Sequence, residues 1–148
     1  MITDSMRDLI TTFNAGSVAT VNADGTPSVS TKATFVVVDP TTIAFGNIRS
    51  PGTVTNLAKL PAIEICFTDV LTRKALRVTG TAKVVRKTEA SADVAQAFAA
   101  AWADYLDRMS SFVVVDVSAV EEILSPAYDD GATEADLKAH NLAKLNAI

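Results

Sequence analysis

The sequence contains few of the residues on which disulfide scaffolds, zinc centres and histidine-based active sites depend. Its 148 residues include one cysteine, one histidine and one tryptophan. A single thiol cannot form an internal disulfide, and one cysteine with one histidine cannot complete a structural zinc site. His140 has no acidic partner at a defined spacing, which argues against a Ser-His-Asp triad. The lone cysteine is typical of a protein of the reducing cytoplasm.

Basic residues and long apolar runs are also scarce. The chain has 13 Lys and Arg against 17 Asp and Glu, a net charge of −4, and no basic block that would neutralise the phosphates of a nucleic acid. Apolar stretches such as Phe35–Val38 are only a few residues long and cannot span a bilayer. The first eight residues lack the basic and apolar regions of an export signal. We therefore expect neither nucleic acid nor membrane as a partner, and a cytoplasmic location.

Glycine is equally sparse, whereas apolar residues are abundant. The six glycines form neither a dinucleotide-binding fingerprint nor a P-loop, so the phosphate cradle of those folds is missing. Hydrophobic residues make up 49% of the chain and the mean hydropathy is +0.26. The length suits one domain with a full core. An apolar excess without a membrane span or signal indicates a large buried interface between subunits.

The hydrophobic periodicity predicts a mainly β protein with flanking helices. Apolar residues from Met6 to Phe13 have helical spacing. Asp24-Gly25 predicts a hairpin between Ser17–Asn22 and Pro27–Val38, and alternation in the second strand assigns Val29 to a core face and Lys32 to a polar face. The remaining predicted elements are strands over Thr42–Gly46, Pro61–Thr68, Arg73–Val85 and Phe112–Ser118 and an alanine-rich helix over Val94–Tyr105.

Strands that follow one another through short loops favour an antiparallel sheet that is closed or nearly closed into a barrel. After this barrel domain, residues 1–124, the sequence predicts a helical arm over residues 125–148. Its leucines, Leu137, Leu142 and Leu145, are too sparse to stabilise a free helix in water. We therefore expect the arm to pack across a dimer.

The segment Gly46–Leu57 leads from a predicted strand into a predicted helix and contains a candidate anion site. Ser50 has the N-cap position and Pro51 the first helical position, where a missing N–H costs nothing. Free N–H groups at a helix start bind anions, and Arg49 lies next to them. Thr53 and Asn56 offer further hydrogen bonds. The alternative is an ordinary capped connector with a solvated arginine.

Two more cations lie among small hydroxyl residues on the polar faces of predicted strands. Lys32 follows Ser30, and Arg77 precedes Thr79. Both are reasonable partners for an oxyanion or a phosphate, but each could equally lie on a solvated outer face. If Lys32 and Arg77 lie close to the Arg49 segment in the fold, the anion-binding interpretation is favoured over the solvated one.

Three stretches of the chain resemble a known family in their order and spacing. They are Ser17–Lys32, Ile43–Ser50 leading to Asn56-Leu57 and Pro61, and Leu76–Lys83. Together they resemble the pyridoxamine 5′-phosphate oxidase-like flavoproteins. The resemblance implies an antiparallel split β-barrel, a homodimer that binds FMN at its interface, and an oxidoreductase that passes a hydride or electrons to a small-molecule substrate. NAD(P)H is one candidate electron donor.

The resemblance also implies where FMN binds. By position, the strand contacts are Ser30, Thr31 and Lys32, the ring contacts are Asn47 and Ile48, and the phosphate contacts are Arg49, Ser50, Thr53 and Asn56. Arg77, if it faces the ring, would stabilise the negative charge of the reduced flavin.

The chain departs from the true oxidase at two places. Pro51-Gly52 stands where the oxidase has an Arg-Lys pair after the loop serine, and nothing after Ser125 corresponds to its basic, aromatic C-terminal motif. We therefore do not expect oxidation of pyridoxamine phosphate. A non-catalytic flavin carrier or storage protein and a deazaflavin- or haem-binding relative remain alternatives, and no metal site is expected.

Overall fold

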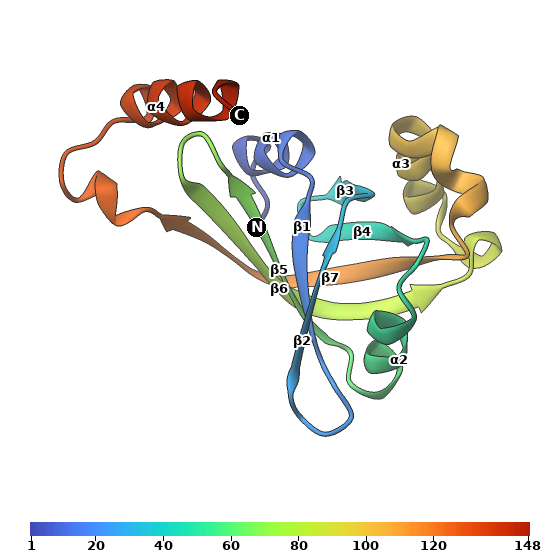
Figure 1. Ribbon diagram of the computed structural model, residues 1–148. Helices are drawn as coiled ribbons and strands as arrows, with labels where there is room; N and C mark the ends of the chain where they lie inside the picture. Colours follow the sequence, from blue (N-terminus) through green and yellow to red (C-terminus); the bar gives the residue numbers. More distant parts are fainter.

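The computed structural model describes residues 1–148 as one antiparallel sheet with flanking helices (Figure 1). The seven strands follow the spatial order β2-β1-β5-β6-β7-β4-β3. They are β1 (Gly16–Val21), β2 (Pro27–Lys32), β3 (Phe35–Asp39), β4 (Thr42–Asn47), β5 (Ala62–Asp69), β6 (Lys74–Val85) and β7 (Ser111–Leu124). The helices are α1 (Asp4–Thr12), α2 (Pro51–Lys59), α3 (Ala92–Trp102) and α4 (Glu134–Asn146), with short 3-10 turns at Lys87–Glu89, Ala103–Arg108 and Pro126–Tyr128. None of the helices combines the length and apolar character needed to cross a membrane.

The sheet curls around its main hydrophobic core. Strands β3 and β5 are separated in the sheet by β4, β7 and β6. Nevertheless the rings of Phe35 in β3 and Phe67 in β5 meet edge to face, with centroids 4.7 Å apart. Gly16 of β1 lies against both rings, because a Cβ atom there would come within 2.8 Å of each. This contact confirms the expectation of a nearly closed antiparallel barrel, with the two edge strands β2 and β3 unpaired with each other.

Helix α3 covers the outer face of β3, β4 and β7. The Phe98 ring stacks on Phe112 at a centroid distance of 4.0 Å, and both side chains are buried. The indole N–H of Trp102 donates to the carbonyl oxygen of Phe35 at 2.9 Å. This second apolar layer explains why Phe35, Val36 and Val37 are buried in succession: β3 is covered on both faces.

The predicted strand Pro27–Val38 is wrong in two respects. It is broken after Lys32 into β2 and β3, and in β2 the faces are reversed. Val29 is 67% exposed, whereas Ser30 and Lys32 are half-buried. The reason is the register: Ser30 lies opposite Val18, which is in the core, so the face with Ser30 and Lys32 is the inner one.

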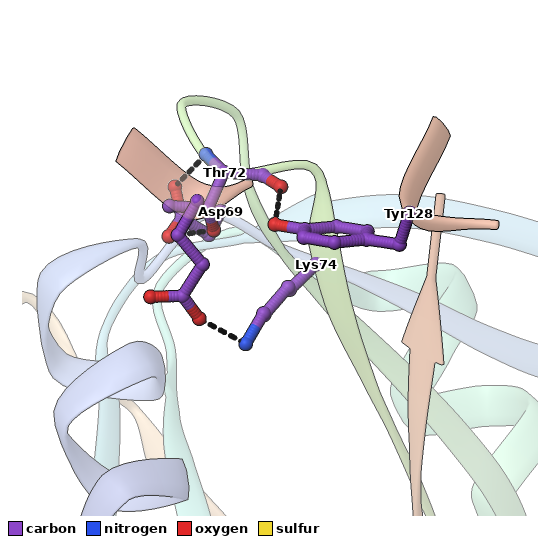
Figure 2. A network of polar contacts seen from close by, with 5 residues as sticks. Asp69, Thr72, Lys74 and Tyr128 are labelled. Carbon is purple, nitrogen blue, oxygen red and sulfur yellow. Dashed lines mark hydrogen bonds and ion pairs between the residues drawn. The ribbon is translucent and has the colours of Figure 1, made fainter. Parts of the chain in front are cut away.

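The C-terminal arm packs on the turn between β5 and β6 of its own chain (Figures 1 and 2). The Asp69 carboxylate accepts hydrogen bonds from the backbone N–H and the hydroxyl of Thr72, which fixes the turn. Tyr128 donates its hydroxyl hydrogen to the carbonyl of Thr72, and Lys74 forms an ion pair with Glu134 that raises the pKa of the lysine. Packing of the arm across a dimer stays a prediction.

Candidate functional site

Helix α2 packs on β1 and β6 and reaches the inner face of β2 at Ser30, running antiparallel to β2. The Asn56 amide donates to the Thr20 hydroxyl at 3.1 Å, and Thr20 is paired with Ser28 of β2. One helical turn earlier, the hydroxyl oxygens of Thr53 and Ser30 are 3.4 Å apart. The N-terminal end of α2 therefore points in the same direction as the C-terminal end of β2, where Lys32 lies.

Lys32 lacks a compensating charge in its half-buried position. It lies opposite Gly16, whose missing Cβ faces the core phenylalanines, so Lys32 is on the inner face. The two ion pairs of the chain join Lys74 to Glu134 and Arg77 to Glu121. Burial lowers the pKa of the Lys32 ammonium, because desolvation disfavours its charged form. An anionic ligand would supply the missing counter-charge.

The start of α2 agrees with the sequence prediction but offers more free donors than expected. Ser50 is the N-cap residue and Pro51 follows at the first helical position, yet the buried Ser50 side chain makes no capping hydrogen bond. The N–H groups of Gly52 and Thr53 have no intrahelical acceptor, as in the first turn of any α-helix. Arg49 is exposed directly before the cap. The helix start therefore has the donors and the partial positive charge of an anion site.

The loop from β4 into α2 is fixed where it leaves β4, at Asn47. Asn47 donates its side-chain amide to the Ser111 hydroxyl at 3.1 Å, and its carbonyl accepts from the Ser110 N–H at 2.9 Å. Thr34, just after β2, accepts from the N–H of Gly46 at 3.0 Å through its hydroxyl. These bonds hold the end of β4 beside the segment that follows Lys32. Ile48, next in the loop, is exposed.

The Asn56 side chain attaches helix α2 to the end of β1. Its amide nitrogen donates to Thr20 and, at 3.0 Å, to the Asn22 side chain, so both of its N–H hydrogens have acceptors inside the chain. Asn56 is buried in the second turn of α2, beyond the free N–H groups. No local pattern in the sequence distinguishes Thr20 or Asn22, because only the tertiary contact with α2 gives them a role.

Thr31 and Arg77 lie on the other face of the sheet from Ser30 and Lys32. Thr31 is opposite Ser17, Ser17 is opposite Cys66, and Cys66 is opposite Arg77, so all four share the outer face. Arg77 is bonded to the Glu121 carboxylate at 2.6 Å, which raises its pKa. The chain thus brings Ser30 to Thr53 and the end of β4 to Thr34, whereas Thr31 and Arg77 lie on the opposite face of the sheet from Ser30 and Lys32.

Comparison with known proteins agrees with this architecture. Residues 2–124 match the family model described as pyridoxamine 5′-phosphate oxidase. The chain belongs to this pyridoxamine 5′-phosphate oxidase-like family. Its seven-stranded antiparallel sheet matches the split-barrel structures of the family.

Solved structures show how widely this fold is shared. HupZ from Group A Streptococcus is 28% identical, with a TM-score of 0.70 over 84% of this chain and 96% of that chain. An FMN-binding protein from Syntrophomonas wolfei is 11% identical, with a TM-score of 0.66 over 80% and 84% of the two chains. An F420 reductase is 21% identical, with a TM-score of 0.57 over 72% and 88%. A search of curated proteins found no match.

Proposed function

We propose that this member of the family is an FMN-binding flavoprotein that acts as an oxidoreductase on a small-molecule substrate. The observation that carries the proposal is Lys32, a half-buried cation without an ion-pair partner, at the end of a strand that contacts α2 through Ser30 and Thr53. The phosphate of FMN would supply the anion that Lys32 lacks, and the fold is shared with an FMN-binding protein.

The residues of the site fit the phosphate group in both charge and hydrogen-bonding capacity. Lys32 would supply the charge, and the hydroxyls of Thr53 and Ser30 and the first N–H groups of α2 would supply hydrogen bonds. Arg49 would add a second charge from the exposed loop. Asn47 and Ile48 would contact the ring, with Asn47 held in place by Ser111. When bound, the flavin would supply the hydride or electron transfer, and the protein its placement.

Thr31 and Arg77 fit this proposal only if the site includes a second copy of the chain. They lie on the outer face of the sheet, where Val29 is 67% exposed and Ile123 is also exposed. An exposed apolar patch of this kind is typical of an interface between subunits. We propose that two chains meet on this face, so that Thr31 and Arg77 approach the cofactor bound by the opposite chain.

The homodimer is testable by light scattering on the purified protein. We expect twice the mass of the 15.6 kDa chain at micromolar concentration. Replacing Val29 by Glu should shift the protein toward the monomer, because it places a charge in the apolar contact, whereas Leu60→Glu, at an exposed leucine after α2, should not. A monomeric protein that binds FMN tightly would contradict both the interface and the shared site.

A second candidate is a deazaflavin-dependent reductase, which the structural similarity to an F420 reductase favours. A flavin carrier without catalysis is a third. The absorption spectrum of the purified protein distinguishes flavin, deazaflavin and haem. Loss of the visible flavin absorption on addition of NAD(P)H, followed by recovery on addition of an acceptor, is expected of the oxidoreductase. A bound flavin that no donor reduces would instead identify a carrier.

A further inference from the structure

A groove lies between the β5–β6 turn and helix α4. Figure 1 shows that these two elements lie at the end of the molecule away from α2. Its volume is about 290 Å³, roughly that of ten water molecules in the liquid. It is lined by Val70, Arg73, Asn141, Lys144, Leu145 and Ile148. Val70 and Leu145 are 46% and 47% exposed, so the groove presents apolar surface to solvent. It is large enough for a small organic molecule.

The charged side chains of this groove are both cationic. Neither Arg73 nor Lys144 takes part in the two ion pairs of the chain, and no carboxylate side chain lines the groove. The only side-chain bond of Arg73 is a weak one, from its guanidinium to the Asn141 amide oxygen at 3.4 Å. The two exposed cations outnumber the one carboxylate of the lining, the terminal group of Ile148, so the groove has a net positive charge. Beside an apolar surface, this charge is complementary to a ligand with an anionic head and an apolar body.

Asn141 and the backbone conformation of the turn both orient Arg73. Asn141 is buried and donates its amide hydrogen to the carbonyl of Leu71 at 2.8 Å, which leaves its oxygen toward Arg73. The backbone of Arg73 has a φ of +58°, in the left-handed region that favours glycine. The turn would form more readily with glycine, so an arginine at this position has a conformational cost.

We propose that this groove binds a small carboxylic acid with an apolar body, such as a medium-chain carboxylate. The carboxylate would lie between Arg73 and Lys144, and the body against Val70 and Leu145. This ligand site is separate from the proposed flavin site at Lys32. Either site can be present without the other.

The test is a nuclear magnetic resonance titration of the nitrogen-15-labelled full chain, with its co-purified cofactor in place. Octanoate is the probe, and acetate and octanol are controls that lack the apolar body or the charge. We expect octanoate to shift the amide signals of residues 70–73 and 141–148. Acetate and octanol should bind at least about fivefold more weakly, since each lacks one of the two interactions. Shifts confined to α2 and β2, or no shifts at millimolar octanoate, would overturn the proposal.

Variants test the two cations individually. Arg73→Gly and Lys144→Gln should each weaken octanoate binding about three- to fivefold, the range for partly exposed charge pairs. Lys138→Gln, on the same helix but outside the groove, should not. Arg73→Gly relieves the positive φ, so its melting temperature should be at least that of the parent and loss of binding cannot be attributed to unfolding. Unchanged octanoate affinity in the double variant would refute the site, whatever the flavin content.

Discussion

Replacing Lys32 by Met is expected to weaken FMN binding about ten- to a hundredfold, the loss of a charge-assisted hydrogen bond of about 1.5–3 kcal/mol. Riboflavin, which has no phosphate, should bind nearly as well to the variant as to the parent. The difference arises because Lys32 has no carboxylate partner in the chain, so its charge is free for a phosphate. Fluorescence quenching of both flavins, titrated side by side, measures the effect.

The same substitution should not lower the stability of the cofactor-free protein. Burial lowers the pKa of Lys32, so its charged form is less favourable in the folded chain than in the unfolded chain. That penalty is complete at pH values below the folded-state pKa of Lys32, decreases as the pH rises from there, and is absent above the higher pKa of the unfolded chain. Lys59→Met, at the exposed opposite end of α2, is the matched control and should alter neither affinity nor stability. Equal losses for FMN and riboflavin in Lys32→Met would place the phosphate elsewhere.

Replacing Asn56 by Ala should lower the free energy of unfolding by about 1–3 kcal/mol, because the buried Asn56 amide and its acceptors on Thr20 and Asn22 lose their hydrogen bonds. Helix α2 would then be less firmly held on β1. We expect FMN and riboflavin affinities to fall by similar factors, since the whole helix start is displaced. Urea denaturation and the two flavin titrations give both quantities.

The neighbouring Thr55 is the control for this experiment. It is exposed on the same helix and forms no side-chain hydrogen bond, so Thr55→Ala should leave both stability and affinity close to those of the parent. A stable Asn56→Ala variant that loses FMN affinity but keeps riboflavin affinity would show that Asn56 is a phosphate ligand, as the family resemblance implies.

Local signals in the sequence predict those parts of the fold that depend on neighbouring residues. Asp24-Gly25 predicts the β1–β2 turn, in which Gly25 has a φ of +85°. Ser50-Pro51 predicts the start of α2, and the apolar spacing near the N-terminus predicts α1. Each of these features is decided within a few residues, where glycine, proline and capping preferences are strong.

Local signals could not predict which side chains of β2 point toward the core. Its residues alternate, so either set of side chains could point toward the core. The prediction that the set with Val29 does so is wrong, because Ser30 and Lys32 are on the inner face. The pairing with β1 and the position of α2 decide the matter, and α2 is more than twenty residues away in sequence. The same limit applies to Arg77, whose polar neighbours are compatible with either face until the register with β5 is known.

The candidate site shows the same division between local and distant information. The helix start and its cation were recognisable from Arg49, Ser50 and Pro51 alone. The anchoring of Asn56 and the half-buried position of Lys32 depend on contacts between strands and helix that no spacing rule contains. A family resemblance names the residues of a site, but it does not say which of them bind the ligand and which hold the helix.

The most direct test of the proposed function is identification of the cofactor itself. The purified full chain is incubated with a mixture of FMN, riboflavin and F420, freed of unbound ligand, and denatured, and the released molecules are identified by mass spectrometry. The account predicts FMN as the main released species from the parent chain and a strong reduction in the Lys32→Met variant. Release of F420 in preference to FMN, or of no flavin at all, would contradict it.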